Sequence, residues 1–458
     1  MLREQLRLLA FNGLPVPSPD TVERVQAELN KHERLSTLLE GELDFHGEDS
    51  GYASHDLHAF AAKFPPQLPR AFIRGLTKRG AIVLDPRMGS GTTVVEAVLE
   101  GRRAVGLDID PLALRLCRAK VTPLNADEIR KAAHRTAVRA RALLCEGQAL
   151  ESELGNRFDG PTKDFVDYWF LPTTQRELMA LVLAIEEETE PLARRFLELT
   201  LSSIIVTKSG GVSRARDLAH SRPHRVDAKV PRNALEQFAM RLQRNLVSIA
   251  RLKANGTLVA TLPGNAAFIP FADETIDLII TSPPYANAID YMRAHKFSLV
   301  WLGEPISDLS RLRSKYIGSE RVGRAQYAPL PKGPESVVEE LGSLDAKKAA
   351  ILRKYFVEMK SVIKEMYRVL RMDSAAVVVA GTSMMRGIDV QTHRCLADIA
   401  AECGFEVVGI VKRSLDRNKR MMPARFGKKT DSMIEQRMHE EFVIGLLKAS
   451  RATGGSVA

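Results

Sequence analysis

The sequence predicts an α/β protein with a doubly wound, mostly parallel sheet, a terminal antiparallel hairpin and an inserted helical domain. Three observations lead to this class. A strand, a Gly-rich turn, a helix and a second strand follow one another in residues 81–110. Further β-rich runs then alternate with helical segments, which is typical of an open parallel sheet. Two strand-like runs close the chain without a helix between them, so they should pair antiparallel.

The composition excludes several classes of protein. With 458 residues, 45% of them hydrophobic, the chain can bury a large core and should not be disordered. Its four cysteines have neither disulfide nor zinc-finger spacing, and we expect no metal site. No signal peptide or membrane span is recognisable, so we expect a cytoplasmic protein without a membrane partner. Against 56 Asp and Glu stand 66 Lys and Arg, a formal net charge of +10 that makes a polyanionic partner plausible.

We expect an N-terminal helical extension over residues 1–50. Within it, residues 21–43 alternate charged side chains with Leu and Val at helical spacing, which predicts an amphipathic helix packed on the main body.

The strand–turn–helix–strand unit carries the first chemical motif. Its turn reads Asp-Pro-Arg-Met-Gly-Ser-Gly-Thr-Thr, and glycines there allow the backbone to approach a ligand at a helix N-terminus. It is not a Walker A loop, because no Lys precedes Thr92, and Val94 stands where a dinucleotide fingerprint has its third Gly. Asp108 ends the second strand, where a carboxylate can accept both hydroxyls of an adenosine ribose.

The chain divides into parts that differ in their pattern of strand-like and helical segments. We expect a cofactor-binding part over residues 51–120, a helical insert over 121–255, a catalytic part over 256–450 and a tail over 451–458. Within the catalytic part, the periodicity predicts a helix near 290–302, a long helix over 346–370, a strand over 375–381, a helix near 389–403 and the two terminal strands over 405–414 and 440–448.

The second chemical motif, Thr281-Ser-Pro-Pro-Tyr285, directly follows the apolar run Ile-Asp-Leu-Ile-Ile. It therefore lies beyond the carboxyl end of a strand, where open α/β sheets bind ligands. The two prolines remove backbone donors and fix φ, which leaves rigid carbonyls beside a hydroxyl and an aromatic ring. Such a site can accept hydrogen bonds from an amino group while Tyr285 stacks on a base.

Together these motifs resemble the S-adenosylmethionine-dependent DNA amino-methyltransferases, which methylate cytosine N4 or adenine N6. The resemblance rests on DPRMGSGTT, GLDID and TSPPY, supported by HAFAAKFPP before the first strand, and covers about residues 55–120 and 255–448. It implies a Rossmann-like methyltransferase fold and S-adenosylmethionine as cofactor. Two positions depart from the family pattern: Arg87 replaces an aromatic residue, and Asn265 replaces an Asp near the cofactor adenine.

The resemblance also implies site residues. The catalytic set would be Ser282, Pro283, Pro284 and Tyr285. The cofactor-binding set would be Lys63, Phe64, Asp85, Gly89, Ser90, Gly91, Thr92, Asp108 and Asn265.

The resemblance implies methyl transfer without a covalent intermediate, which agrees with the absence of a Pro-Cys pair. Ser282 and the Pro283 carbonyl would hold the amine, and the base would be flipped out of the duplex. Ser before Pro-Pro favours cytosine N4 over adenine N6. An RNA base amino-methyltransferase and a catalytically silent nucleic-acid-binding protein stay open as alternatives.

Double-stranded DNA is the expected partner, with a companion restriction endonuclease as a further one, and the oligomeric state is left open. The helical insert is the first candidate for target recognition, and residues 304–345, with Arg311, Arg313, Lys315, Arg321 and Arg324, are its rival. Two basic runs supply candidate DNA contacts: Arg214, Arg216, Arg222 and Arg225 in the insert, and Lys412, Arg413, Arg417, Lys419 and Arg420 in the terminal hairpin. A solvated charged face is the alternative for each run.

Overall fold

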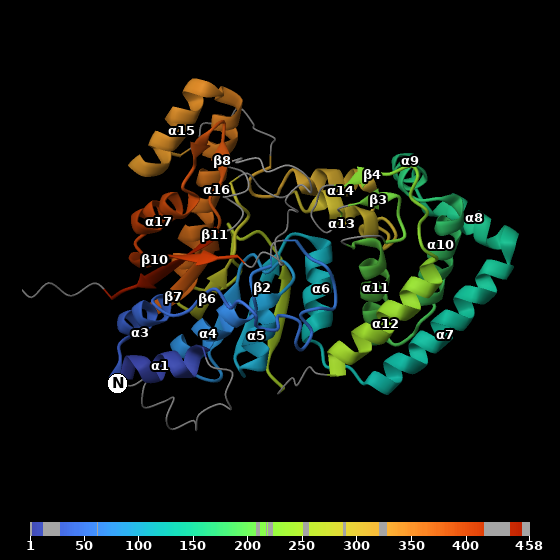
Figure 1. The fold of residues 1–458 in the computed structure, drawn as a ribbon, viewed down its shortest axis with the longest axis horizontal. Helices are drawn as coiled ribbons and strands as arrows, with labels where there is room; N and C mark the ends of the chain where they lie inside the picture. Colours follow the sequence, from blue (N-terminus) through green and yellow to red (C-terminus); the bar gives the residue numbers. More distant parts are fainter. Residues whose placement is uncertain are drawn as a thin grey trace, which may run out of the picture.

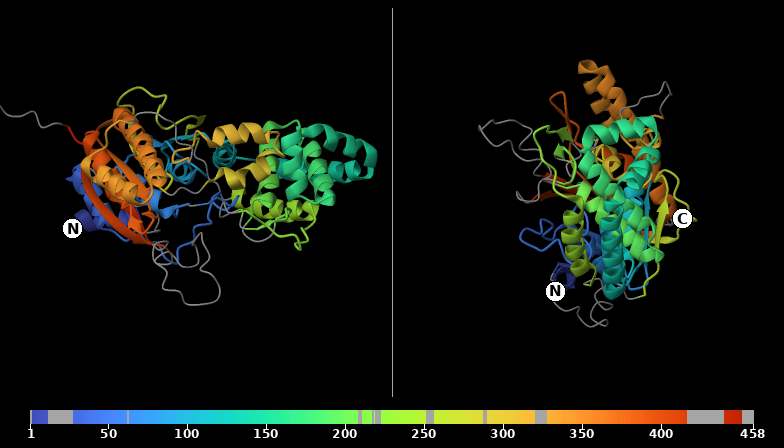
Figure 2. Two further views of the ribbon diagram at one scale, coloured as in Figure 1. Left: turned by 90° about the horizontal axis from the view of Figure 1, so that it is seen from above. Right: turned by 90° about the vertical axis from the view of Figure 1, so that its right-hand side faces the viewer.

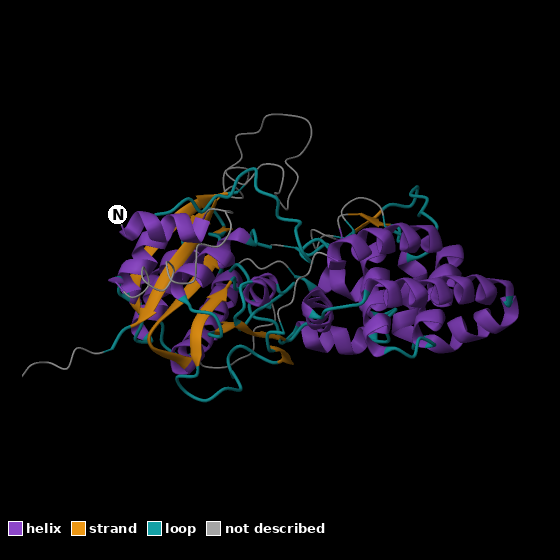
Figure 3. Cartoon of the chain, turned by 90° about the horizontal axis from the view of Figure 1, so that it is seen from below, coloured by secondary structure: helices purple, strands orange, loops and turns teal. Residues whose placement is uncertain are grey.

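The chain forms a sheet-containing lobe and a helical lobe that lie side by side (Figure 1). The computed structural model describes residues 2–11, 28–61, 63–207, 211–216, 218, 223–250, 256–286, 290–319, 328–415 and 440–450. Viewed from above, the helical lobe extends away from the sheet (Figure 2). Apart from the short pair β3 (Ala215–Arg216) and β4 (His224–Arg225), the strands lie in the sheet-containing lobe (Figure 3).

The main sheet has seven strands in the order β10-β11-β7-β6-β1-β2-β5. Their bounds are β1 (Ile82–Asp85), β2 (Arg103–Asp108), β5 (Val259–Pro263), β6 (Ile276–Thr281), β7 (Leu370–Ala380), β10 (Glu406–Ser414) and β11 (Glu440–Lys448). The strands from β7 to β5 in this order pair parallel, whereas β11 is antiparallel to both β7 and β10. The predicted parallel sheet and terminal antiparallel hairpin are confirmed.

Helices cover both faces of the sheet, which explains why its central strands are mostly apolar. On β6, Leu278 and Ile280 belong to one buried cluster and Ile279 to another, because successive side chains point to opposite faces. The Ile279 face packs against α15 (Lys332–Leu344), α16 (Ala346–Val369) and α17 (Thr392–Glu402). The opposite face packs against α1 (Leu2–Phe11), α3 (Lys31–Leu39), α4 (Gln67–Leu76) and α5 (Thr92–Leu99).

The N-terminal helices are thus one layer of the sheet-containing lobe rather than an extension from it. Leu6 and Leu35 are fully buried in the same cluster as Val83 of β1. The predicted helix over residues 21–43 is interrupted before Lys31 and ends at Leu39 rather than at residue 43. Asn30 caps α3 by accepting from the Glu33 amide at 2.9 Å, while Glu33 accepts from the Asn30 amide, so this capping box begins the helix at Lys31. Residues 21–27 lie outside the described part of the chain.

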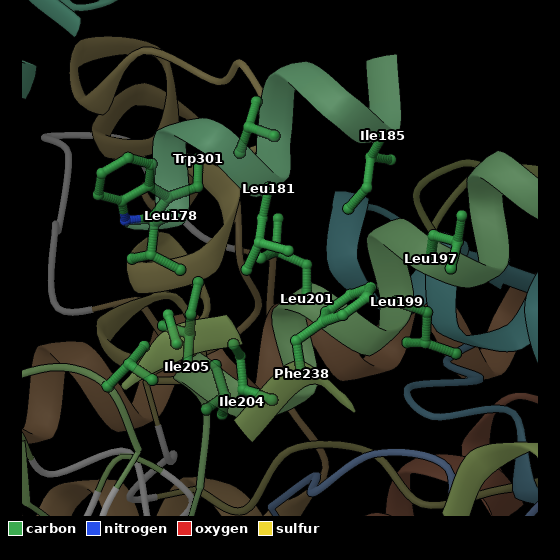
Figure 4. Packing of buried hydrophobic residues seen from close by; sticks show 14 of the residues in the cluster. Leu178, Leu181, Ile185, Leu197, Leu199, Leu201, Ile204, Ile205, Phe238 and Trp301 are labelled. Carbon is green, nitrogen blue, oxygen red and sulfur yellow. The ribbon is translucent and has the colours of Figure 1, made fainter. Parts of the chain in front are cut away.

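The helical lobe has its own core. It contains α7 (Ala126–Cys145), α8 (Gly147–Arg157), α9 (Gly160–Trp169), α10 (Pro172–Glu186), α11 (Pro191–Ile205) and α12 (Ala234–Ala250). Figure 4 shows Leu178, Leu201 and Phe238 among the side chains of this core. Trp301, which follows α13 (Met292–Leu299), is 1% exposed in the same core, and α14 (Ile306–Arg313) also contributes to it. The lobe therefore combines helices of the predicted insert with α13, Trp301 and α14, which follow the Ser-Pro-Pro-Tyr motif in the sequence.

One helix joins the two lobes. Helix α6 (Pro111–Val121) follows β2, and its Leu112 and Leu116 are buried in the core of the helical lobe. The remaining short strands are β8 (Met384–Met385) and β9 (Ile388–Asp389), which form a small hairpin after β7. Among the described residues, no helix is long and apolar enough to cross a membrane.

Candidate active site

The Gly-rich loop lies between β1 and α5 and depends on two glycines. Gly91 caps α5 in the left-handed region with φ 80°, and a Cβ there would lie 2.5 Å from the Cys117 sulfur. Gly89 also has a positive φ of 48°. Below the loop, the buried Lys120 ammonium donates to the Ser90 carbonyl at 2.8 Å, and burial lowers the pKa of Lys120 well below its usual value. The loop is thus fixed by its backbone conformation and by a bond from α6.

Asp108, at the end of β2, is tied to this loop. Its two carboxylate oxygens accept from the amides of Gly89 and Asp110, each at 2.9 Å. Burial raises the pKa of Asp108, and the nearby Arg87 guanidinium partly offsets this rise. Each carboxylate oxygen can accept a second hydrogen bond, so the pair of oxygens remains available to two neighbouring hydroxyls.

A pocket of about 660 Å³, partly open to solvent, joins the two predicted motifs. Of the predicted residues, the pocket is lined by Lys63, Phe64, Asp85, Gly89, Ser90, Thr92, Asp108, Ser282 and Pro284. Residues from positions far apart in the sequence therefore surround one cavity at the carboxyl ends of β1, β2 and β6.

Asp85 is a buried carboxyl in the floor of this pocket. It accepts from the Arg87 amide at 3.1 Å, and burial raises its pKa to about 7. A cationic group bound beside it would favour the ionised form and lower that pKa. Asp85 therefore suits a ligand that carries an ammonium.

An aromatic wall completes the pocket, and its members are not among the residues predicted from the sequence. Phe60, Tyr291 and Tyr316 line the cavity, with the Phe60 and Tyr291 rings stacked 5.5 Å apart. The Tyr316 hydroxyl donates to Asp110 at 2.8 Å, and the His295 ring lies 2.6 Å from the same oxygen. Phe60 precedes Lys63, and the two tyrosines follow the Ser-Pro-Pro-Tyr motif. Their positions near the motifs in the sequence are therefore what could have predicted a place in the pocket.

The Ser-Pro-Pro-Tyr loop leaves β6 at Thr281 and is held from two sides. The buried Tyr355 of α16 donates to the Pro284 carbonyl at 2.9 Å. The Tyr285 hydroxyl donates to Glu441 of β11 at 2.5 Å, and burial raises the pKa of Tyr285 well above its usual value. Neither Tyr355 nor Glu441 stands in a motif, so only the fold reveals their contact with this loop.

Asn265 is not among the residues that line the pocket. It follows β5, whose Pro263 pairs with Asp108, so the chain places it near that carboxylate. Its side chain, however, accepts from the Ala267 amide at 3.0 Å within its own turn. Pro283 and Tyr285 do not line the pocket either, and Gly91 acts through the loop conformation.

The basic run of the insert is partly neutralised. Asp227 forms ion pairs with Arg214 at 2.6 Å and with Arg225 at 2.8 Å, and the Arg225 guanidinium also lies over the Tyr168 ring. Arg216 is exposed, and Arg222 lies outside the described residues. In the rival region, Arg311 pairs with Asp308 and Arg313 with Asp290, while Arg321 and Arg324 lie outside the described residues.

In the terminal hairpin, the prediction that Arg413 contacts DNA is wrong. Its side chain is 3% exposed and forms an ion pair of 2.5 Å with Glu441, because the two residues lie directly opposite on β10 and β11. Lys412 is exposed and pairs with Glu440 at 2.8 Å. Arg417, Lys419 and Arg420 fall outside the part of the chain that the structure describes.

The comparisons with known proteins agree with the motifs. The family model described as DNA methylase (N6_N4_Mtase) matches residues 26–118. The chain is 25% identical over 385 residues to the Type II methyltransferase M.MvaI of Kocuria varians, a match that covers 78% of this chain and 83% of that protein. It is 30% identical over 159 residues to M.AvaI of a Nostoc species, covering 31% of this chain and 33% of that protein.

A solved TehB-like SAM-dependent methyltransferase of Corynebacterium glutamicum is 9% identical, with a TM-score of 0.26, and the match covers 82% of this chain and 85% of that chain. At this score the likeness adds nothing to the strand order described above. The sequence matches and both motifs support the N4/N6 family of DNA amino-methyltransferases as the family that this chain resembles.

Proposed function

We propose that this methyltransferase transfers a methyl group from S-adenosylmethionine to an exocyclic amino group of a flipped base in double-stranded DNA, with cytosine N4 as the favoured target. The observation that carries the proposal is the single pocket that the Gly-rich loop, Asp108 and the Ser282-Pro284 segment share. S-adenosylmethionine is the cofactor, and it supplies the reactive methyl group when bound.

The residues of the pocket fit this cofactor. Asp108 can accept hydrogen bonds from the ribose hydroxyls. Asp85 places a carboxyl next to the Gly-rich loop, where it can bind the ammonium of the methionine part. Gly89 and Gly91 add no side chain to the loop at their two positions, and Lys63 and Phe64 form the neighbouring wall. We assign Ser90 and Thr92 to the same cofactor site, because they also line it.

The Ser-Pro-Pro-Tyr loop would act on the target amine. The lone pair of that amine is delocalised into the base, which makes it a poor nucleophile. Acceptors at Ser282 and the Pro283 carbonyl would hold the two amine hydrogens and aim the nitrogen lone pair into the pocket. No side chain needs to form a covalent bond with the base. Tyr285 would stack on the extruded base.

The choice of cytosine rests on Ser282. Members of the family that act on cytosine N4 resemble this chain in having Ser before Pro-Pro, whereas Asp or Asn is common in the adenine enzymes. Both amines need similar acceptors, so adenine N6 is the alternative outcome of the same chemistry.

We assign DNA contact to the helical lobe. Arg232, Arg241 and Arg244 line a hollow beside α11 and α12, and none of the residues that line it carries a carboxylate. The hollow includes Ala59, the neighbour of Phe60 in the active-site wall, so a duplex placed at the pocket could reach these arginines. Phosphates are the expected ligands of such a cluster. A companion restriction endonuclease is proposed from the Type II names of the relatives.

A competition assay tests the substrate class. The purified protein is incubated with labelled S-adenosylmethionine, DNA of diverse sequence and an equal mass of RNA. Methyl incorporation into DNA that RNA does not suppress supports the proposal. Equal or better incorporation into RNA would show that the chain is an RNA amino-methyltransferase, and cofactor binding without transfer to either polymer would support a silent binder.

A further inference from the structure

We propose that Glu441 is a positioning residue for methyl transfer: its carboxylate, held by Arg413, fixes the Tyr285 ring before a base arrives. The inference rests on the proposed function, because Tyr285 is there the surface on which the target base stacks. It adds two residues, neither of which belongs to a motif, to the machinery of the reaction.

Tyr285 is held at the hydroxyl end of its side chain by a close approach and by a hydrogen bond. The ring lies against Gly381, which follows β7, so closely that a Cβ at Gly381 would be 2.9 Å from the Tyr285 ring carbon that bears the hydroxyl. The hydroxyl donates to Glu441 at 2.5 Å. Because Phe442 pairs with Ala380 in the sheet, Glu441 is brought next to Gly381 at the strand end. The sheet register therefore places the acceptor where the ring ends.

Arg413 fixes the other oxygen of Glu441. Its terminal nitrogen lies 2.5 Å from that oxygen, and its Nε donates to the Leu43 carbonyl at 3.0 Å. Both charged side chains are almost fully buried. The Glu441 carboxylate is buried, and its two oxygens bond to different partners, one to a guanidinium and one to a phenol. It therefore has little freedom to rotate. The Tyr285 hydroxyl consequently meets an acceptor that cannot move away.

The neighbouring ion pair on the hairpin provides a comparison. Lys412 and Glu440 lie one position away on β10 and β11, are much less buried than Arg413 and Glu441, and pair at 2.8 Å. Their carboxylate makes no described contact with the Ser-Pro-Pro-Tyr loop. A function limited to hairpin stability would be shared by the two pairs, whereas a function in catalysis belongs to Glu441 alone.

The substitution Glu441→Gln replaces one of the two carboxylate oxygens by an NH₂ group. In the Gln amide the remaining oxygen can still accept from Arg413, but the NH₂ that replaces the other oxygen cannot accept from the Tyr285 hydroxyl. Tyr285 should therefore lose its charged acceptor and the stronger hydrogen bond that comes with it. A ring that is no longer fixed must be ordered when the base binds, which raises the cost of forming the productive complex.

The test compares Glu441→Gln, Tyr285→Phe, the double variant and the control Glu440→Gln in the full chain. We expect each single variant to lower kcat/KM for unmethylated genomic DNA by about tenfold, as for one hydrogen bond to a charged group. The double variant should lose no more than either single variant, because both remove the same bond. Cofactor affinity, measured by calorimetry, should stay within about twofold in every variant, as should the activity of Glu440→Gln.

Three results would overturn the proposal. One is activity of Tyr285→Phe equal to that of the wild type; this variant keeps the ion pair, so it decides the question even if Glu441→Gln fails to fold. The second is a double variant whose losses multiply. The third is a wild-type protein that methylates no DNA, which would remove the proposed function as well and is thereby distinguished from the first two.

Discussion

Tyr355 donates a hydrogen bond of 2.9 Å to the carbonyl of Pro284, so the second of the two motif carbonyls is already engaged inside the protein. Among the described residues, none donates to the carbonyl of Pro283. The motif thus has one carbonyl that anchors it to α16 and one that can accept from a substrate. This division of roles agrees with the assignment of Pro283, together with Ser282, to the target amine.

Removing the anchor should impair turnover. Tyr355→Phe keeps the buried ring but leaves the Pro284 carbonyl without its donor, so the loop should hold the amine less firmly. We expect kcat to fall by about tenfold while cofactor affinity is unchanged, since one buried hydrogen bond contributes about 1 kcal/mol and loop orientation adds to its effect. Single-turnover methylation at saturating DNA measures the change. Unaltered kcat would show that the bond does not position the loop.

Asp108→Asn should weaken cofactor binding. An amide cannot accept from the Gly89 and Asp110 amides with both of its atoms, so one backbone donor loses its partner and the ribose loses a charged acceptor. The dissociation constant for S-adenosylmethionine should rise by about tenfold or more. Asp127→Asn, on the exposed end of α7, removes an equal charge as the control. Calorimetry that finds both variants equal to the wild type would remove Asp108 from the cofactor site.

The Gly91 position should tolerate no side chain. An alanine there must adopt a positive φ and place its Cβ 2.5 Å from the Cys117 sulfur. We expect a loss of about 2 kcal/mol or more in the free energy of unfolding, together with loss of cofactor binding. Gly155→Ala in α8 is the control, because no atom lies within 4 Å of its added Cβ, and it should stabilise the protein by up to about 1 kcal/mol. Urea unfolding compares the two variants.

The buried Asp85 predicts a pH dependence of stability. Its pKa is about 7 in the folded chain and about 3.9 in an unfolded chain. Between these values the folded protein holds more protons, so the Asp85 contribution to stability, complete below about pH 4, is lost as the pH rises through about 7. Asp85→Asn does not titrate, and its unfolding free energy relative to the wild type should rise from pH 4 to 7 and level off above 8. A difference independent of pH would contradict the prediction.

The arginine hollow predicts a change in salt dependence. If Arg232 and Arg244 contact phosphates, replacing both by Ala should reduce the slope of log Kd against log salt by about 2, since each phosphate contact contributes about 0.9. Arg141→Ala, exposed on α7 and outside the hollow, should leave the slope unchanged. Fluorescence anisotropy with duplex DNA measures the slopes. Equal slopes in all three proteins would place the DNA elsewhere.

Local patterns were sufficient to predict much of this molecule. The Gly-rich turn between β1 and α5 and the apolar run of β6 each have short-range signatures, and the pocket unites the motifs attached to them. The terminal hairpin was also predictable, because two strand-like runs without a helix must pair directly.

What failed depends on contacts between distant residues. Arg413 stands in a basic run and reads as a surface residue, but strand pairing places it opposite Glu441, where both are buried. Likewise, nothing near Tyr355 in the sequence indicates that its hydroxyl reaches Pro284. The composition of a segment does not show whether a given residue in it is buried, because burial depends on the partners that the fold brings to that residue.

Mass spectrometry of nucleosides can identify the methylated base in DNA incubated with the protein and isotopically labelled S-adenosylmethionine, with Ser282→Ala as the paired variant. We expect labelled N4-methylcytosine from the wild type and a strong reduction with Ser282→Ala, whose cofactor affinity should be retained. Labelled N6-methyladenine would keep the mechanism and change the base. Label on neither amine, or full activity of Ser282→Ala, would contradict the assignment of this site.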